Sequence, residues 1–196
     1  MRRTLLALVA LLALAAVVAV GLTQADEGAE SSGPSPAFDL ERARRDLAGA
    51  PVPLASLHDQ ANQLLPGGEK AFRARLESLR GHPVVVNKWA SWCGPCRAEF
   101  PAFQRQATER GKEIAFLGID SGDTRGEART FLRDYPVPFP SYEDPDGTIA
   151  KRHAPRAYFP TTVFIDERGR TAFIHQGGYA SSQALAADID RHLGRG

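Results

Sequence analysis

Short apolar runs alternate with stretches of helical periodicity along most of this chain, and this alternation limits the folds open to it. A continuous apolar run without a polar face is typical of a strand buried on both sides, whereas a 3.6-residue period is typical of a helix that covers a sheet. Strands and helices in alternation predict an α/β fold with a central sheet flanked by helices. We predict strands at 84–89, 114–119, 161–166 and 170–175, and helices at 69–79, 94–110, 126–135 and 183–193.

The N-terminus is predicted to be a targeting segment and not part of this fold. Arg2 and Arg3 precede an uncharged apolar run over 5–22, and an acidic stretch follows it. The run is just long enough to cross the roughly 30 Å hydrocarbon core of a membrane, and the basic flank favours a cytoplasmic N-terminus. We favour a retained signal anchor over 1–25, which places the rest of the chain outside the cytoplasm. Cleavage after Ala25, giving a secreted protein, is the alternative.

The rest of the chain is predicted to be a tether followed by one domain. Residues 26–50 mix Ser, Gly and Pro with charges and are predicted to be a flexible tether, within which 40–47 is a candidate short helix. Residues 51–196 are enough to form a single core. The chain has 24 basic and 23 acidic side chains, a net charge of +1. This balance argues against a nucleic-acid partner, because such proteins carry a surplus of basic residues that meet phosphates.

Cys93 and Cys96 are the only cysteines, which excludes a disulfide-stapled framework and a four-cysteine zinc site. They stand where the first predicted strand meets its helix. At the helix start, Cys93 meets unpaired backbone N–H groups and the positive end of the helix dipole, which favour the thiolate. The spacing places the two Cα atoms about 5–6 Å apart, which permits a disulfide. We therefore predict a redox pair in which Cys93 attacks and the more buried Cys96 resolves the mixed disulfide.

The stretch VVVNKWASWCGPCRAEFPAF resembles the thioredoxin superfamily, and its surroundings resemble the membrane-tethered branch of TlpA-like, ResA-like and CcmG-like proteins. The likeness extends over residues 80 to 193. It implies a thioredoxin-like fold with a mixed central sheet, in which 121–157 contains the central insertion typical of this branch. It also implies a thiol–disulfide oxidoreductase that acts on disulfides of other proteins.

The resemblance also assigns roles to residues around the cysteines. Trp92, Gly94 and Pro95 would form the active-site loop, with Trp92 as a lid beside the reactive sulfur; a packed aromatic side chain is the alternative for Trp92. Pro160 would follow a cis peptide bond and face the sulfurs, which is a specific expectation because cis bonds are uncommon. Phe159 would offer backbone atoms to a substrate peptide.

Two positions bear on proton transfer. Asn87 stands where thioredoxin has a buried aspartate that helps to take the proton of the resolving thiol, and Asn cannot act as that base. In the membrane-tethered branch an acidic residue follows the second cysteine by three positions, and Glu99 matches it. The resemblance therefore suggests that Glu99 tunes the thiols or relays the proton. An ordinary solvated helix charge is the alternative for Glu99.

Other site types find less support in the sequence. His153 and His175 are the candidate partners for a CxxC metal site, but they lack the spacing of a ligand pair and zinc takes about four ligands. Covalent haem attachment needs His directly after the second cysteine, where Arg97 stands. We therefore expect no metal and no cofactor beyond the redox-active disulfide. Gly177 and Gly178 either leave room for a substrate chain near the predicted cis-proline or are turn glycines.

The predicted function is that of an exported, membrane-tethered reductase of disulfides in envelope proteins, and the resemblance suggests apocytochrome c as a client. Such a reductant needs electrons, which by the resemblance come from a membrane protein fed by cytoplasmic thioredoxin. Because the cell exterior is oxidising, an oxidant or isomerase of the same fold is an alternative. A metal-binding module is another. A thiol peroxidase would resemble Pro and Thr where this chain has Val86 and Ala90.

Overall fold

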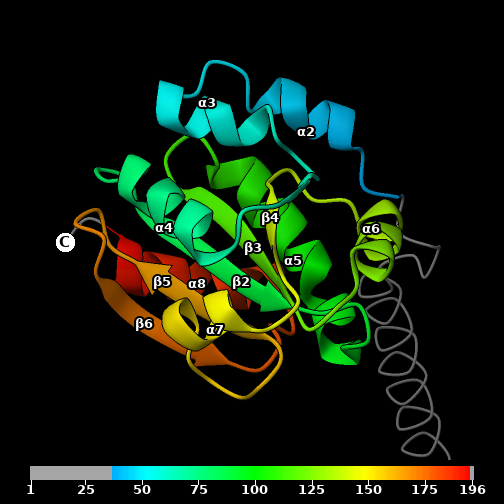
Figure 1. Cartoon of the computed structure of the whole chain (residues 1–196). Coiled ribbons are helices and arrows are strands. Elements are labelled where there is room, and N and C mark those ends of the chain that lie inside the picture. The colour runs from blue at the N-terminus through cyan, green and yellow to red at the C-terminus, as the bar shows by residue number, and fades with distance from the viewer. Residues whose placement is uncertain (1–36, 195–196) are drawn as a thin grey trace, which may run out of the picture. The chain divides into compact units, whose positions relative to one another are not determined.

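The computed structural model describes residues 37–194 (Figure 1). Within these residues, six strands form one sheet in the order β1-β4-β3-β2-β5-β6. The strands are β1 (Leu64–Leu65), β2 (Val84–Trp89), β3 (Ala115–Ser121), β4 (Ser141–Asp144), β5 (Thr161–Ile165) and β6 (Thr171–Gln176). The helices are α2 (Leu40–Asp46), α3 (Val52–His58), α4 (Gly68–Ser78), α5 (Gly94–Arg110), α6 (Arg125–Asp134), α7 (Thr148–His153) and α8 (Ser182–Leu193).

The sheet is mixed, as predicted. β2 pairs parallel with β3 on one side and antiparallel with β5 on the other. β5 and β6 form the predicted antiparallel hairpin, whereas β4 pairs parallel with both β3 and β1. The parallel connection from β2 to β3 runs through α5, so the start of α5 lies at the carboxyl end of β2. In an α/β sheet this end is where sites assemble.

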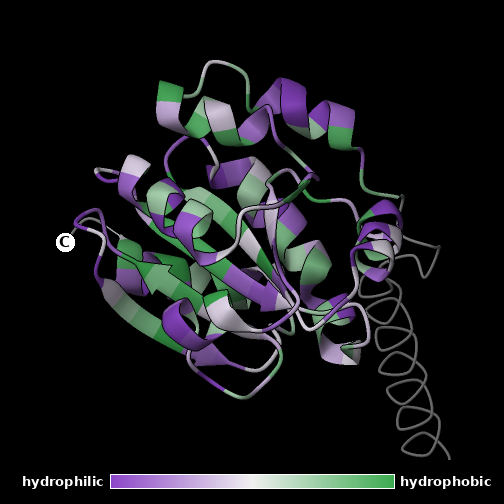
Figure 2. Cartoon of the chain, in the orientation of Figure 1, coloured by the Kyte–Doolittle hydropathy of each residue, from purple (hydrophilic) through white to green (hydrophobic). Residues whose placement is uncertain are grey.

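Helices cover both faces of the sheet, which explains why the central strands are continuously apolar (Figure 1). One face packs against α5, α6 and α8 through a cluster that includes Val85, Trp89 and Phe100. The other face packs against α3, α4 and α7 through a second cluster, which includes Val86 and Phe72. Figure 2 shows the same arrangement as apolar colour along the strands and hydrophilic colour on α2 and other outer helix surfaces.

Several short elements were not predicted because they are too short or too polar to give an apolar pattern. β1 has two residues, and β4 has the sequence SYED, whose Ser141 and Asp144 are nevertheless fully buried. Asp144 accepts hydrogen bonds from the backbone of Ile149 (2.8 Å) and Ala150 (2.9 Å), so a buried polar strand end caps α7. The segment predicted to contain an insertion, 121–157, therefore holds α6, β4 and α7.

The candidate short helix predicted over 40–47 is confirmed by α2 (Leu40–Asp46), whereas the prediction of a flexible tether over 26–50 is wrong from residue 38 onward. Asp39 caps α2 by accepting a hydrogen bond from the backbone N–H of Arg42 (2.9 Å), and Ala43 and Leu47 are buried. The sequence of α2 resembles a tether because its apolar stripe is narrow and its outer side carries charged residues. The domain therefore begins before residue 51.

The predicted signal anchor over 1–25 and the first part of the tether, 26–36, lie outside the described residues. Across residues 37–194, none of the helices combines the length and the apolar character that crossing a membrane requires.

Candidate active site

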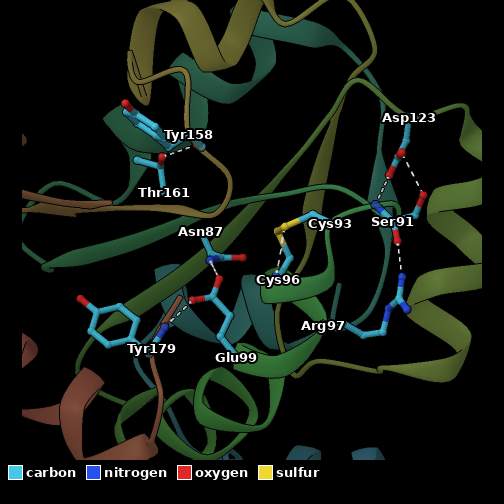
Figure 3. The surroundings of a disulfide bond; sticks show 10 residues. All are labelled: Asn87, Ser91, Cys93, Cys96, Arg97, Glu99, Asp123, Tyr158, Thr161 and Tyr179. Atoms are coloured by element: carbon cyan, nitrogen blue, oxygen red, sulfur yellow. Dashed lines mark hydrogen bonds between the residues drawn. A yellow bond between two sulfur atoms is a disulfide. The ribbon is translucent and has the colours of Figure 1, made fainter. Parts of the chain in front are cut away.

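Cys93 and Cys96 form a disulfide at the junction of β2 and α5, and their Cα atoms are 5.3 Å apart, within the predicted range. Cys93 is the N-cap of α5, and its Sγ accepts a hydrogen bond from the backbone N–H of Cys96 (3.1 Å; Figure 3). Gly94 and Pro95 open the helix, where Pro is favoured because its missing N–H would have no helical partner. The helix start therefore directs a donor at the sulfur of Cys93, as the sequence predicted.

The two cysteines differ slightly in exposure. Both belong to the apolar cluster beneath α5, but Cys93 keeps 4% of its surface exposed whereas Cys96 has none. A thiol that attacks another protein must be reached from outside, so Cys93 suits the attacking role and Cys96 the resolving role.

Glu99 is fully buried on α5, so the alternative of a solvated helix charge is wrong. One carboxylate oxygen accepts a hydrogen bond from Asn87 Nδ2 (2.7 Å), and the other accepts one from the backbone N–H of Tyr179 (3.1 Å; Figure 3). Burial raises the pKa of Glu99 to about 7, and the two donors offset part of this effect. Asn87, which cannot itself act as a base, thus holds a carboxyl group that can.

Pro160 follows a cis peptide bond, as predicted. Its carbonyl accepts a hydrogen bond from the backbone N–H of Gly177 (3.0 Å), where φ is +98° and glycine is favoured. A Cβ on Gly178 would lie 3.3 Å from the Pro95 carbonyl oxygen and 3.8 Å from Pro160 Cγ. Gly178 therefore lies close to both the active-site loop and the cis-proline, and the positive φ of Gly177 is that of a turn glycine.

Trp92 is not a packed core residue, because 60% of its surface is exposed. Its ring centroid lies 4.9 Å from that of Phe159, which precedes the cis bond. The two aromatic side chains thus link the turn before Cys93 to the segment before β5. Trp89, three residues earlier on β2, is fully buried and stacks on Phe131 of α6.

Comparison with known proteins places this geometry in a family. A protein-family model described as the AhpC/TSA family matches residues 44–174. The chain belongs to the AhpC/TSA family. The thiol-disulfide oxidoreductase ResA of Oceanobacillus iheyensis is 34% identical over 106 residues, which are 53% of this chain and 54% of that relative. The thiol:disulfide interchange protein DsbE homolog of Paracoccus denitrificans is 40% identical over 103 residues, which are 52% of this chain and 55% of the relative.

The chain spans about half the length of these two curated relatives. A crystal structure from Chlorobium tepidum, assigned the name thiol:disulfide interchange protein DsbE, is 33% identical, with a TM-score of 0.55. The match covers 61% of this chain and 85% of that one. The thioredoxin-like α/β fold and the resemblance to the ResA and DsbE type of protein are thereby confirmed.

In this AhpC/TSA protein, Asp123 holds the turn before the cysteines, a role that was not predicted from the sequence. Asp123 accepts hydrogen bonds from the backbone N–H (2.6 Å) and the hydroxyl (2.9 Å) of Ser91, and Arg97 donates to the Ser91 carbonyl (3.0 Å; Figure 3). Asp120 is buried beside them at the end of β3. Burial, followed by the neighbouring Asp123, raises the pKa of Asp120 to about 9. The sequence signal that could have pointed to these residues is the polar group directly after the apolar run of β3.

The two histidines weighed as metal ligands lie apart, each beside a different carboxylate. His153 Nε2 lies 3.3 Å from Glu69 Oε1, and His175 Nδ1 lies 3.5 Å from Asp188 Oδ2. Over residues 37–194, no group of three or more His, Cys, Asp or Glu side chains is arranged to hold a metal ion.

Proposed function

We propose that the protein is a thiol–disulfide oxidoreductase that exchanges disulfides with other proteins through Cys93. The observation that carries this proposal is the Cys93–Cys96 disulfide at the start of α5, with a backbone N–H directed at the sulfur of Cys93. In the dithiol form, the same donor and the helix dipole stabilise a thiolate at Cys93. The names of the ResA and DsbE relatives support the same reaction.

The proposed cycle has two exchange steps. The Cys93 thiolate attacks one sulfur of a substrate disulfide, so that a Cys93–substrate bond forms as the substrate bond breaks, and the leaving thiolate takes up a proton. Cys96 then loses its proton and attacks Cys93. The Cys93–Cys96 disulfide re-forms and the second substrate thiol leaves, so two electrons have passed to the substrate.

Glu99 is proposed to take the proton that Cys96 loses. Cys96 is fully buried and cannot give its proton directly to water, and Glu99 stands one helical turn further along α5. A base with a pKa of about 7 is suited to accept and return a proton near neutral pH.

The substrate chain is proposed to bind along Phe159 and Pro160, under the exposed ring of Trp92. The support is the contact between Trp92 and Phe159, and the close approach of Gly178, which has no side chain, to Pro95 and Pro160. The active-site loop of Trp92, Gly94 and Pro95, predicted from the resemblance, would thus form one side of the binding region.

Electron flow is proposed to run from this protein to disulfides of envelope proteins, with apocytochrome c as a candidate client and a membrane protein as electron donor. The support is the CGPC sequence, since thioredoxin has a reduction potential of about −270 mV against about −120 mV for the oxidant DsbA. The N-terminal apolar run supports a membrane tether on the extracytoplasmic side.

Equilibration of the full chain with a series of glutathione redox buffers tests the direction. We expect a potential within about 40 mV of thioredoxin, together with reduction of insulin disulfides. A potential near that of DsbA would instead make the protein an oxidant or isomerase. Rapid oxidation of Cys93 by peroxide, with slow insulin reduction, would indicate a peroxidase, and stoichiometric metal on the purified chain would indicate a metal-binding module.

A further inference from the structure

Lys88 is a buried cation next to the candidate binding region, and none of the steps above uses it. It lies on β2, one residue before Trp89, and only 2% of its surface is exposed. Its cross-strand neighbours in the sheet are Ile119 on β3 and Thr161 on β5. An ammonium group in such surroundings is costly unless it has close polar partners.

The partners of Lys88 lie in the segment that leads to the cis-proline. Nζ donates a hydrogen bond to the backbone carbonyl of Arg156, and it lies 4.4 Å from the centroid of the Phe159 ring. Burial lowers the pKa of Lys88, while the charge of Asp144 acts in the opposite direction. The ammonium therefore bonds one end of the segment 156–160 and contacts the aromatic ring near its other end.

This segment has little regular structure of its own. Residues 154–160 connect α7 to β5 without a helix or strand. Tyr158 is exposed (67%), and its carbonyl accepts a hydrogen bond from the hydroxyl of Thr161 (2.7 Å; Figure 3). A connection of this kind stays in one conformation only if the sheet holds it, and Lys88 supplies a charged hydrogen bond from a central strand.

Phe159 connects this bond to the active-site loop. Its ring contacts the ammonium of Lys88, and its centroid lies 4.9 Å from that of the Trp92 ring. A hydrophobic side chain at position 88 would fill the same place in the sheet without burying a charge. It would leave the Arg156 carbonyl without this donor and Phe159 without this cation.

We propose that Lys88 is a positioning residue for substrate binding, which holds the segment 156–160 so that Phe159 and Pro160 are ready to receive a protein chain. Lys88 acts through the segment and not on the reacting sulfurs. The inference rests on the proposed function. It predicts that Lys88 matters for large substrates, which contact the segment, and not for small disulfides, which need only Cys93.

Steady-state reduction of insulin and of glutathione disulfide by the full chain tests this division. For Lys88→Met we expect the KM for insulin to rise about tenfold, since a charged hydrogen bond is lost, while kcat and the rate with glutathione disulfide change less than about twofold. Lys88→Arg, which keeps the charge and the donors, restores most of the affinity. Lys70→Met, on the exposed surface of α4, is the matched control, and we expect it to leave the kinetics with both substrates unchanged.

A double-mutant cycle with Phe159→Leu and hydrogen exchange complete the test. If Lys88 acts through Phe159, the effects of Lys88→Met and Phe159→Leu on the KM for insulin are not additive, and amides at 156–159 exchange faster in Lys88→Met. Additive effects, equal losses with both substrates, or unchanged exchange would overturn the inference. A wild-type chain that reduces neither substrate would overturn the proposed function, while the exchange rates would still decide whether Lys88 holds the segment.

Discussion

At the residue scale, Glu99 combines complete burial with a pKa of about 7. Near neutral pH it therefore alternates between a carboxylic acid and a carboxylate beneath the redox pair. Its two hydrogen-bond donors, Asn87 and the backbone of Tyr179, orient both carboxylate oxygens in the charged form. In the proposed cycle, Glu99 can therefore accept the proton of Cys96 only above its pKa.

We predict that Glu99→Gln removes a pH dependence from the resolving step. In the wild-type chain the rate of release of a mixed disulfide should rise as pH increases through about 7, because Glu99 becomes the carboxylate. In Glu99→Gln this inflection is absent and the rate at pH 8 is about tenfold lower or more. Stopped-flow measurements from pH 5 to 9 check this, with the exposed Glu109→Gln of the same helix as control. An inflection near 7 that persists in Glu99→Gln would contradict the role.

The raised pKa of Asp120 leads to a prediction about how stability depends on pH. Burial raises its pKa in the folded chain to about 9, whereas in the unfolded chain the pKa is about 3.9. Between these values the folded state retains a proton that the unfolded state releases, so the free energy of unfolding decreases as pH rises through this window. Asp120→Asn keeps a donor toward Asp123 and removes the titration.

Thermal unfolding at several pH values measures this effect. We expect Asp120→Asn and wild type to have similar Tm values at pH 4, and the variant to have a Tm higher by roughly 5 °C or more at pH 8. Parallel dependence of the two Tm values on pH would show that Asp120 is ionised in the folded chain, contrary to this account.

At the element scale, the glycine turn after β6 brings the far end of the chain to the cysteines. Gly178 lies against Pro95 and Pro160, and an added Cβ would meet the Pro95 carbonyl oxygen at 3.3 Å. We predict that Gly178→Ala slows insulin reduction by about tenfold, since a shift of the turn narrows the binding region. Gly126→Ala, in α6 with open space around it, is the control and should be neutral or slightly stabilising. Equal rates of insulin reduction by Gly178→Ala and wild type would contradict the proposal that Gly178 borders the binding region.

A substitution next to helix α2 tests where the domain begins. Leu47 directly follows α2 and is buried, and its side chain occupies the space beside Gly111 at the end of α5. We predict that Leu47→Ala lowers the free energy of unfolding by about 2–4 kcal/mol, whereas the exposed Arg45→Ala changes it by less than about 0.5 kcal/mol. Urea titration distinguishes the two variants. No loss in Leu47→Ala would support the original prediction of a tether up to residue 50.

The elements predicted from the sequence are those whose pattern is local. β2, β3 and the β5–β6 hairpin have continuous or alternating apolar residues, and α5 begins at a recognisable turn. β4 could not be predicted in this way because Ser141 and Asp144 are buried by partners elsewhere in the chain. Trp89 Nε1 donates a hydrogen bond to Ser141 Oγ (3.1 Å), and the backbone at the start of α7 donates to Asp144. Such pairings depend on the tertiary fold and leave no periodic signal.

At the scale of the whole molecule, the candidate site joins one local motif to distant segments. The roles of Cys93 and Cys96 follow from a strand-to-helix turn that the sequence displays directly. The burial of Glu99 depends on Tyr179, 80 positions away, and the support of Ser91 depends on Asp123, 32 positions away. The resemblance pointed to Glu99, but the sequence alone could not show whether its side chain is exposed to solvent or buried in the core. The contacts of Lys88 with Arg156 and Phe159 were likewise invisible before the fold was known.

Covalent trapping tests the central claim, that Cys93 exchanges disulfides and Cys96 releases the product. In Cys96→Ser the mixed disulfide cannot resolve, so the reduced full chain, mixed with insulin, should accumulate an adduct linked at Cys93 that dithiothreitol cleaves. Peptide mapping by mass spectrometry identifies the linked residue. Wild type should show the adduct only transiently and Cys93→Ser should not form it. An adduct that forms equally in Cys93→Ser, or none in Cys96→Ser while insulin is still reduced by wild type, would contradict the account.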